Sequence, residues 1–366
     1  MMTKIEYEQL GRLNEPFFTE IKLAVNKVIE SGWYILGREV ELFEIEFAQW
    51  VGAKYCVGVA NGLDALTLSL RALELPAGSE VLVPSNTYIA TILAILHAGH
   101  KPVLVEPSEK TLNIDWRQLP AKLTNKTKAL CLVHLYGSAC DMKEILEFSS
   151  AHGLAVVEDC AQSHGATYAN VQTGTFGQAG CFSFYPTKNL GAMGDAGAVV
   201  TDDERVAHRL KYLRNYGSAV KYHNKFVGYN SRLDEIQAAI LRVKLKYLNQ
   251  INEYKNHLAN VYFANLCEDY VLPHRSAGRH DVYHIFPIRT PRRDELRTWL
   301  TDRGVKTEIH YPLPPHRQEA MVGLFNDDYP IAEKIHKQIL SLPISFANTT
   351  EDVMTVCRLL NEFSKN

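Results

Sequence analysis

A single lysine stands in a stretch of the sequence that otherwise consists mainly of aromatic and small residues. In FSFYPTKNLGAMGDAGAVV, residues 182–200, Lys188 is followed by glycines and alanines, and Asp195 is the only other charge. Burial penalises an ammonium group, so apolar surroundings favour the neutral form of a lysine. A neutral amine is a nucleophile that forms a Schiff base with an aldehyde. The alternative, a surface lysine that extends its charge into solvent, fits poorly with the near absence of other charges.

Three further features lie upstream of this lysine, each after an apolar run. Asp159 ends the run AVVED, and a carboxylate at the end of a buried strand needs a cation or a polar partner. Asn61, Gly62 and Leu63 follow CVGVA and begin a helix-like stretch, so free N–H groups there could bind an anion. Tyr88 offers a flat aromatic face. Each feature also has an ordinary structural alternative, namely a capping carboxylate, a capped strand-to-helix turn and a core aromatic residue.

Together the four features match one cofactor. The amine suits an aldehyde, the carboxylate suits a protonated ring nitrogen, the helix start suits a phosphate, and the tyrosine suits a flat ring. Pyridoxal phosphate carries all four groups, and proteins commonly hold it by a lysine Schiff base and an Asp partner for the ring nitrogen. The residues therefore predict a pyridoxal phosphate site in which Lys188 tethers the cofactor and Asp159 keeps its ring nitrogen protonated.

The elements that must position these residues are short apolar runs, most of them near-continuous rather than alternating. Such runs are typical of strands that are covered on both faces. Helix-like segments such as 62–73 and 87–99 separate several of them, which predicts a mostly parallel α/β sheet. The last two runs are separated only by the lysine loop and need not be parallel. The runs lie at 56–60, 80–85, 101–107, 129–137, 155–160, 180–185 and 197–203.

A second, smaller domain is expected after the sheet. Residues 232–266 are interpreted as one long helix that leads to a C-terminal α+β unit. We predict a large cofactor-binding domain at 1–245, which includes the N-terminal segment, and a small domain at 246–366.

Composition excludes several classes of function. The net charge of −2 in 366 residues argues against general binding to nucleic acid or to a membrane surface. The apolar runs are too short to span a bilayer, and the N-terminus is too polar for a signal peptide. Seven scattered cysteines without a C-x-x-C pair favour buried thiols and a cytoplasmic location. A nucleotide-binding dehydrogenase is excluded because no G-x-G-x-x-G follows the first strand.

The segments EDCAQSHGA, FSFYPTKNLGAMGDAGAVVT and GYNSRLDEIQAAIL resemble those of the DegT/DnrJ/EryC1/StrS sugar aminotransferases. The resemblance covers essentially the whole chain. It implies PLP fold type I, the aspartate aminotransferase-like fold, with a mixed, mostly parallel seven-stranded sheet in the large domain. It also implies the cofactor contacts: Gly62, Leu63 and Ser183 at the phosphate, Tyr88 on the ring, Asp159 at its nitrogen, Gln162 at its phenolic oxygen, Lys188 at the aldehyde, and Asn230 at the phosphate of the neighbouring subunit's cofactor.

The same resemblance implies a homodimer with shared active sites. Glutamate would donate its amino group, leaving pyridoxamine phosphate, and a nucleotide-linked keto sugar would accept it. The sugar contacts implied are Tyr185, His310, Tyr311 and His316, and Lys221 is chosen as a cross-subunit clamp for the diphosphate of the nucleotide sugar. Lys221 lies in the basic segment 209–225, which a solvated loop explains nearly as well. No metal is expected, because the histidine spacing near residue 310 fits no zinc pattern, and His280 and His284 are assigned no role.

The loop after the lysine, N-L-G-A-x-G-D-A-G, resembles the family branch that acts at C3 of dTDP-3-keto-6-deoxyhexoses. The expected product is a dTDP-3-amino-3,6-dideoxyhexose of galacto or gluco configuration, for a surface polysaccharide such as an O-antigen or S-layer glycan. Two alternatives stay open, a C4-directed enzyme and a non-catalytic regulator that keeps the cofactor fold. A dehydratase of the family would carry histidine in place of the lysine, so the presence of Lys188 favours transamination.

Overall fold

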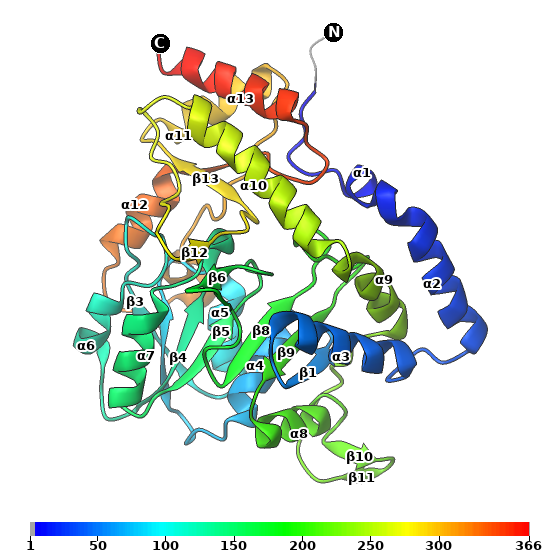
Figure 1. Cartoon of the computed structure of the whole chain (residues 1–366). Helices are drawn as coiled ribbons and strands as arrows, with labels where there is room; N and C mark the ends of the chain where they lie inside the picture. The colour runs from blue at the N-terminus through cyan, green and yellow to red at the C-terminus, as the bar shows by residue number, and fades with distance from the viewer. Residues whose placement is uncertain (1–3, 366) are drawn as a thin grey trace.

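The structure, a computed structural model, describes residues 4–365 of the chain (Figure 1). Its centre is a seven-stranded sheet in the order β1-β9-β8-β5-β4-β2-β3. Strand β9 pairs antiparallel with both β1 and β8, and the other neighbouring pairs are parallel. The predicted mixed, mostly parallel sheet is therefore confirmed. The strands are β1 (Tyr55–Val59), β2 (Glu80–Pro84), β3 (Lys101–Val105), β4 (Thr127–Val133), β5 (Ala155–Asp159), β8 (Ala179–Ser183) and β9 (Gly197–Thr201).

Helices cover both faces of this sheet, which explains why the strands are apolar throughout. Alternate residues of a strand point to opposite faces. In β4, Ala129 and Cys131 pack in one apolar cluster with α4, α5 and α8, whereas Leu130 and Leu132 pack in another with α6 and α7. A third cluster joins α3 and α9 to β8 and β9. The helices are α3 (Arg38–Val51), α4 (Gly62–Ala72), α5 (Ile89–His97), α6 (Leu119–Lys122), α7 (Met142–Ala151), α8 (Glu204–Leu213) and α9 (Glu235–Leu245).

The single long helix expected at 232–266 is instead two helices. Helix α9 ends at Leu245, and α10 (Leu248–Asn265) begins after Lys246 and Tyr247. Tyr247 has φ −106° and ψ −1°, and its ring packs 5.0 Å from that of Phe17. The break redirects the chain from the core of the large sheet to a second core. No glycine or proline marks it, so the sequence pattern did not reveal it.

The second core lies around α10 and the C-terminal elements (Figure 1). Ile5 pairs with Val305 and packs in this cluster, although the predicted large domain included the N-terminal segment. The division at residues 245 and 246 itself stays a prediction. The elements here are the antiparallel pair β13 (Phe286–Arg289) and β14 (Ile339–Leu342), with α11 (Arg293–Asp302), α12 (Pro330–Gln338) and α13 (Thr350–Phe363).

Smaller elements complete the described chain. The N-terminal helices are α1 (Leu10–Asn14) and α2 (Phe18–Ser31), and a hairpin projects beside α8, made of β10 (Ser218–Val220) and β11 (His223–Asn224) (Figure 1). A three-stranded sheet contains β6 (Thr167–Tyr168), β7 (Val171–Gln172) and β12 (Arg279–His280). Between residues 4 and 365 no helix is both long and apolar enough to cross a bilayer.

Candidate active site

Lys188 lies in a tight loop between the antiparallel strands β8 and β9. Its N–H donates to Tyr185 O at 2.8 Å, and Ala192 N donates to Phe184 O at 2.8 Å. Gly191 permits the tight turn, because a Cβ there would lie 2.4 Å from the carbonyl oxygen of Pro186. The loop backbone thus fixes where the lysine side chain starts.

Asp159 ends β5, where the sequence places it, and it is 6% exposed. Thr91 Oγ1 donates to its Oδ2 at 2.9 Å, and Ala161 N donates to its Oδ1 at 3.1 Å. Burial raises the pKa of Asp159, against these hydrogen bonds and the attraction of Lys188. Burial also lowers the pKa of Lys188 to about 8, although Asp159 opposes this. The two groups therefore act on each other, and a neutral amine is accessible near neutral pH.

The start of α4 forms a cradle with β8 and β9. The Asn61 side chain accepts a hydrogen bond from Asp64 N at 2.8 Å and caps the helix. A Cβ on Gly62 would lie 2.6 Å from the Cβ of Ser183, and one on Gly197 would lie 2.4 Å from Asn61 O. The start of α4, the end of β8 and the start of β9 can approach this closely only because Gly62 and Gly197 lack side chains. The N–H groups of the first helical turn have no acceptor within the helix, which suits an anion.

Tyr88, Gln162 and Tyr311 form a connected group. The rings of Tyr88 and Tyr311 are 5.0 Å apart, and Tyr88 keeps 53% of its surface exposed. Gln162 accepts from Tyr136 N at 2.6 Å and donates from Nε2 to Tyr311 Oη at 3.1 Å. The second Nε2 proton of Gln162 is left for a ligand. The structure thus joins two predicted cofactor contacts to one predicted sugar contact.

Two histidines beside the lysine had no predicted role. His284 Nε2 lies 3.5 Å from Lys188 Nζ. The ring of His164 packs against Phe182 at 5.5 Å. Burial and then the Lys188 charge hold the pKa of His284 well below its ordinary value and that of His164 at about 3. For His164 the sequence offered a signal, its place in the EDCAQSHGA segment, whereas His284 comes from a segment 96 residues beyond the lysine and carried none.

Among the predicted sugar contacts, His310 and Tyr185 differ in environment. Tyr136 Oη donates to His310 O at 2.6 Å, and burial followed by the Lys188 charge lowers the pKa of His310 to about 4. Tyr185, by contrast, is 53% exposed. Tyr136 was not predicted, since nothing in its sequence neighbourhood distinguishes it from a core aromatic residue.

Three predicted residues have partners that are not among the predicted site residues. Asn230 is exposed and pairs with Asn215 through the backbone. Lys221 lies at the tip of the β10–β11 hairpin, with its Nζ 5.1 Å from the Tyr222 ring centre. His316 has a side chain only 3% exposed and contacts Glu333 at 3.2 Å. Their roles stay predictions.

A buried cluster of His134, Glu158 and Cys160 places possible metal-ligand atoms within 4.8 Å of one another. Hydrogen bonds already use its carboxylate. Glu158 accepts from the backbone N–H groups of Gly174, Phe176 and Gly177 at 2.8 Å each, and His134 Nε2 lies 2.9 Å away. These contacts secure the loop before β8 and explain the cluster without a metal.

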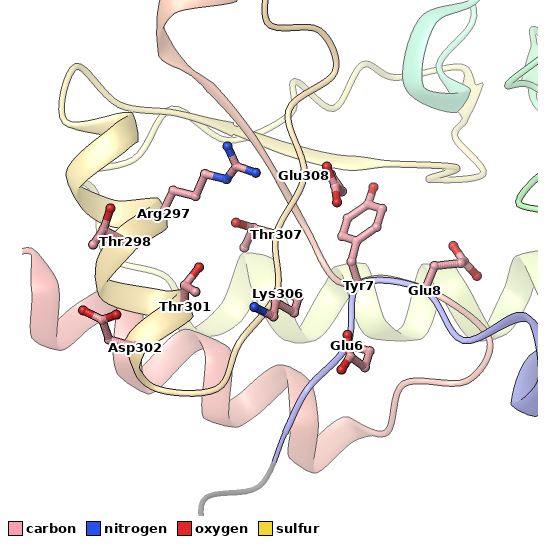
Figure 2. Close-up of a pocket in the computed structure, with 10 residues that line it drawn as sticks. All are labelled: Glu6, Tyr7, Glu8, Arg297, Thr298, Thr301, Asp302, Lys306, Thr307 and Glu308. Carbon is pink, nitrogen blue, oxygen red and sulfur yellow. The ribbon is translucent and has the colours of Figure 1, made fainter.

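A hollow of about 680 Å³ lies elsewhere, between the N-terminal segment, α11 and residues 306–308 (Figure 2). Its lining residues include Tyr7, Arg297 and Glu308 and none of the predicted site residues. The Tyr7 ring, which lines the hollow, lies 5.8 Å from that of His310.

Comparison with known proteins agrees with this geometry. The profile of the DegT/DnrJ/EryC1/StrS aminotransferase family matches residues 18–361. The dTDP-3-amino-3,6-dideoxy-alpha-D-galactopyranose transaminase of Aneurinibacillus thermoaerophilus is 48% identical over 98% of this chain and 99% of its own. Streptomyces venezuelae DesV, solved with a ketimine intermediate, is 42% identical with a TM-score of 0.97 over 99% of both chains. Bacillus subtilis NtdA, solved with its cofactor PMP, is 30% identical with a TM-score of 0.93 over 100% of this chain and 86% of its own.

Proposed function

We propose that this chain, which belongs to the DegT/DnrJ/EryC1/StrS aminotransferase family, moves an amino group from glutamate to C3 of a dTDP-3-keto-6-deoxyhexose. The product would be a dTDP-3-amino-3,6-dideoxyhexose, of galacto or gluco configuration. The observation that carries the proposal is the placement of the half-buried Lys188 and the buried Asp159 at the carboxyl edge of the sheet, together with the named activity of the relative from A. thermoaerophilus.

The residues present fit pyridoxal phosphate. Asp159 is a buried carboxylate whose raised pKa indicates the lack of a strong cationic partner, which a protonated ring nitrogen would supply. Lys188 would bind the aldehyde carbon, and the cradle at Gly62 and Ser183 would take the phosphate. Tyr88 would cover the ring, and the free Nε2 proton of Gln162 would reach its phenolic oxygen. When bound, this cofactor supplies an electron sink for the carbon that loses a proton.

The chain's own chemistry centres on the Lys188 amine. Lys188 Nζ accepts the proton from Cα of the glutamate donor and, in the second half of the reaction, delivers a proton to C3 of the sugar. The lowering of the Lys188 pKa to about 8 by burial brings a neutral fraction within reach near neutral pH, so the amine can both accept and deliver a proton. The lowered pKa values of His164, His284 and His310 keep those imidazoles neutral, so they do not repel the ammonium form.

Tyr185, His310 and Tyr311 are the proposed sugar contacts, and the connection from Gln162 to Tyr311 supports this by joining cofactor and sugar residues. Lys221 and His316 are also proposed to contact the substrate. A homodimer with shared sites is also proposed, in which Asn230 acts on the neighbouring subunit's cofactor. The exposure of Asn230 and Lys221 supports a role across an interface. The seven free cysteines support the proposed cytoplasmic setting, and the product would serve a surface glycan.

The cofactor proposal is tested by borohydride reduction of the protein reconstituted with pyridoxal phosphate, followed by peptide mapping. The pyridoxyl group should lie on Lys188, and a label at another lysine would overturn the assignment. A Lys188→Ala variant should remain unlabelled and fold.

The regiochemistry is tested by offering 3-keto and 4-keto dTDP-6-deoxyhexoses with glutamate and locating the new nitrogen by NMR. Faster formation of a 4-amino product would replace the proposal by the C4-directed alternative. No product from either sugar, with a cofactor absorbance that glutamate leaves unchanged, would favour the non-catalytic regulator.

Sharing of the active site is tested by mixing a Lys188→Ala variant with an inactive Asn230→Ala variant. If sites are shared, each mixed dimer contains one repaired site and part of the activity returns. No recovery after demonstrated subunit exchange would contradict a trans role for Asn230.

A further inference from the structure

Two buried lysines hold the loop that carries Lys188. Lys255 on α10 is 5% exposed, and its Nζ donates to Asn189 Oδ1 and to His284 O, each at 3.1 Å. Lys244 on α9 is fully buried and donates to Gly191 O. Buried ammonium groups are destabilising unless they are paired or hydrogen-bonded. Here both ammonium groups donate to the lysine loop: Lys255 to Asn189, the residue after Lys188, and Lys244 to Gly191, three positions after it.

Lys255 contacts the residue that follows Lys188 in the chain and the backbone of His284, whose ring lies beside the Lys188 amine. Asn189 follows Lys188 in the chain, and its Nδ2 donates to Asn252 Oδ1 at 2.8 Å and to Val282 O at 3.0 Å. His284 presents Nε2 to Lys188 Nζ at 3.5 Å. One ammonium therefore links the side chain of the residue after Lys188 to the backbone of the histidine whose ring lies beside the Lys188 amine.

A carboxylate from the N-terminal segment supplies opposite charge. Glu8 is a coulombic neighbour of both buried lysines, and their attraction lowers its pKa against the larger effect of burial, which raises it to about 6. In Figure 2 the Glu8 carboxylate points away from Arg297 and Lys306, on the far side of the hollow. Its Oε1 is buried and has no hydrogen-bond partner among the described residues. Glu8 thus lines the hollow and also interacts electrostatically with the two buried lysines.

We propose that Lys255 is a positioning residue for Lys188, fixing the amine relative to His284 through Asn189 and the His284 backbone. This rests on the proposed function only in taking Lys188 as the catalytic lysine. A displacement of about 1 Å at a reacting group can reduce the rate ~10²-fold. The Lys255 charge also acts on Lys188, because two like charges disfavour each other's ionised forms.

The charged groups around Lys188 determine what a pH measurement reports. Asp159 favours the ammonium form of Lys188. The charges of Lys188 and Lys255 disfavour each other, and the Lys188 charge adds to the lowering of the Lys255 pKa by burial. Neutral imidazoles add little charge at neutral pH. The titratable groups that face Lys188 are Asp159 from β5, His164 after β5, His284 before β13, His310 after α11 and Lys255 from α10.

The first experiment uses the cofactor-free protein, so it does not depend on transaminase activity. Trinitrobenzene sulfonate labels neutral amines, and peptide mapping over a pH series gives the midpoint for Lys188 in the wild type, in Lys255→Met and in Lys246→Met. Lys246 is a matched control because it is 63% exposed in its ion pair with Glu20. We expect Lys255→Met to raise the Lys188 midpoint by on the order of one pH unit and Lys246→Met to leave it unchanged.

The second experiment uses the reconstituted enzyme. Lys255→Met should lower kcat ~10²-fold with little change in KM for glutamate, because Lys255 is buried and its Nζ donates to Asn189 and His284. Lys255→Arg, which keeps charge and donors, should recover part of kcat. An unchanged Lys188 midpoint together with an unchanged kcat in folded Lys255→Met would overturn the proposal. Failure of both Lys255→Met and Lys255→Arg to fold would also overturn it, because Lys255 would then be a purely structural residue. Pyridoxyl labelling of another lysine would instead overturn the proposed function.

Discussion

Replacing the catalytic lysine should stabilise the cofactor-free protein. In Lys188→Met the side chain keeps its approximate length and loses its charge, so the penalty for burying an ammonium disappears. The variant loses the contact with His284 at 3.5 Å, which is too long for a strong hydrogen bond. The free energy of unfolding should therefore rise although the enzyme is inactivated.

The size of the effect follows from the pKa of Lys188, which is about 8 in the folded chain against 10.5 for an ordinary lysine. At about 1.4 kcal/mol per pH unit, the difference corresponds to about 3 kcal/mol, which is an upper value because the side chain is only partly buried. The folded pKa is depressed, so the penalty is fully present below pH 8. It is lost as the pH rises to 10.5, because the folded form releases its proton first.

The assay is urea unfolding of cofactor-free wild type and Lys188→Met at equal protein concentration, from pH 7 to pH 10.5. The variant should be more stable by about 1–3 kcal/mol at pH 7, and this advantage should shrink toward zero near pH 10.5. Lys246→Met should show no comparable trend. A variant that is no more stable than wild type at pH 7, or an advantage independent of pH, would refute burial as the cause of the lowered pKa.

Three shorter predictions concern the surrounding scaffold. Asp159→Asn should fold and lose most turnover, because an amide cannot hold a ring nitrogen protonated; near-normal turnover would make the residue a cap. Gly197→Ala should weaken phosphate binding, measured by pyridoxal phosphate titration, because its Cβ would lie 2.4 Å from Asn61 O, whereas Gly11→Ala, with nothing within 4 Å, should not. Glu158→Gln should lower the free energy of unfolding by about 1–3 kcal/mol, since an amide donor would face backbone N–H groups; equal urea midpoints would contradict this.

The sequence was informative wherever a residue type is dictated by its local chemistry. Buried strands need apolar residues on both faces, so the strands of the sheet could be recognised, and Lys188 and Asp159 could be found because charges are rare in such surroundings. The break at Lys246 and Tyr247 could not be found, because its dihedral angles are nearly helical and need no special residue.

Contacts between residues far apart in the chain could not be predicted from the sequence, for a different reason. His284 meets Lys188 only because α10 and the start of β13 pack beside the lysine loop, 96 residues away along the chain. Lys255 lies among polar residues of α10, such as Glu253 and Asn256, so the helix pattern predicts nothing about its contact with Asn189. Such contacts depend on the relative placement of two cores, which neither periodicity nor motif spacing specifies.

Every pKa shift at the site favours the uncharged form of its group. Burial raises the pKa of Asp159 and lowers those of Lys188, His284 and His310. A site of this kind is destabilised by its own charges, and a ligand that brings a cation to Asp159 and an aldehyde to Lys188 would relieve both penalties at once. Burial therefore both makes Lys188 nucleophilic near neutral pH and makes the folded chain favour such a ligand. The expected stability gain of Lys188→Met and the chemistry proposed for the lysine thus have the same physical cause.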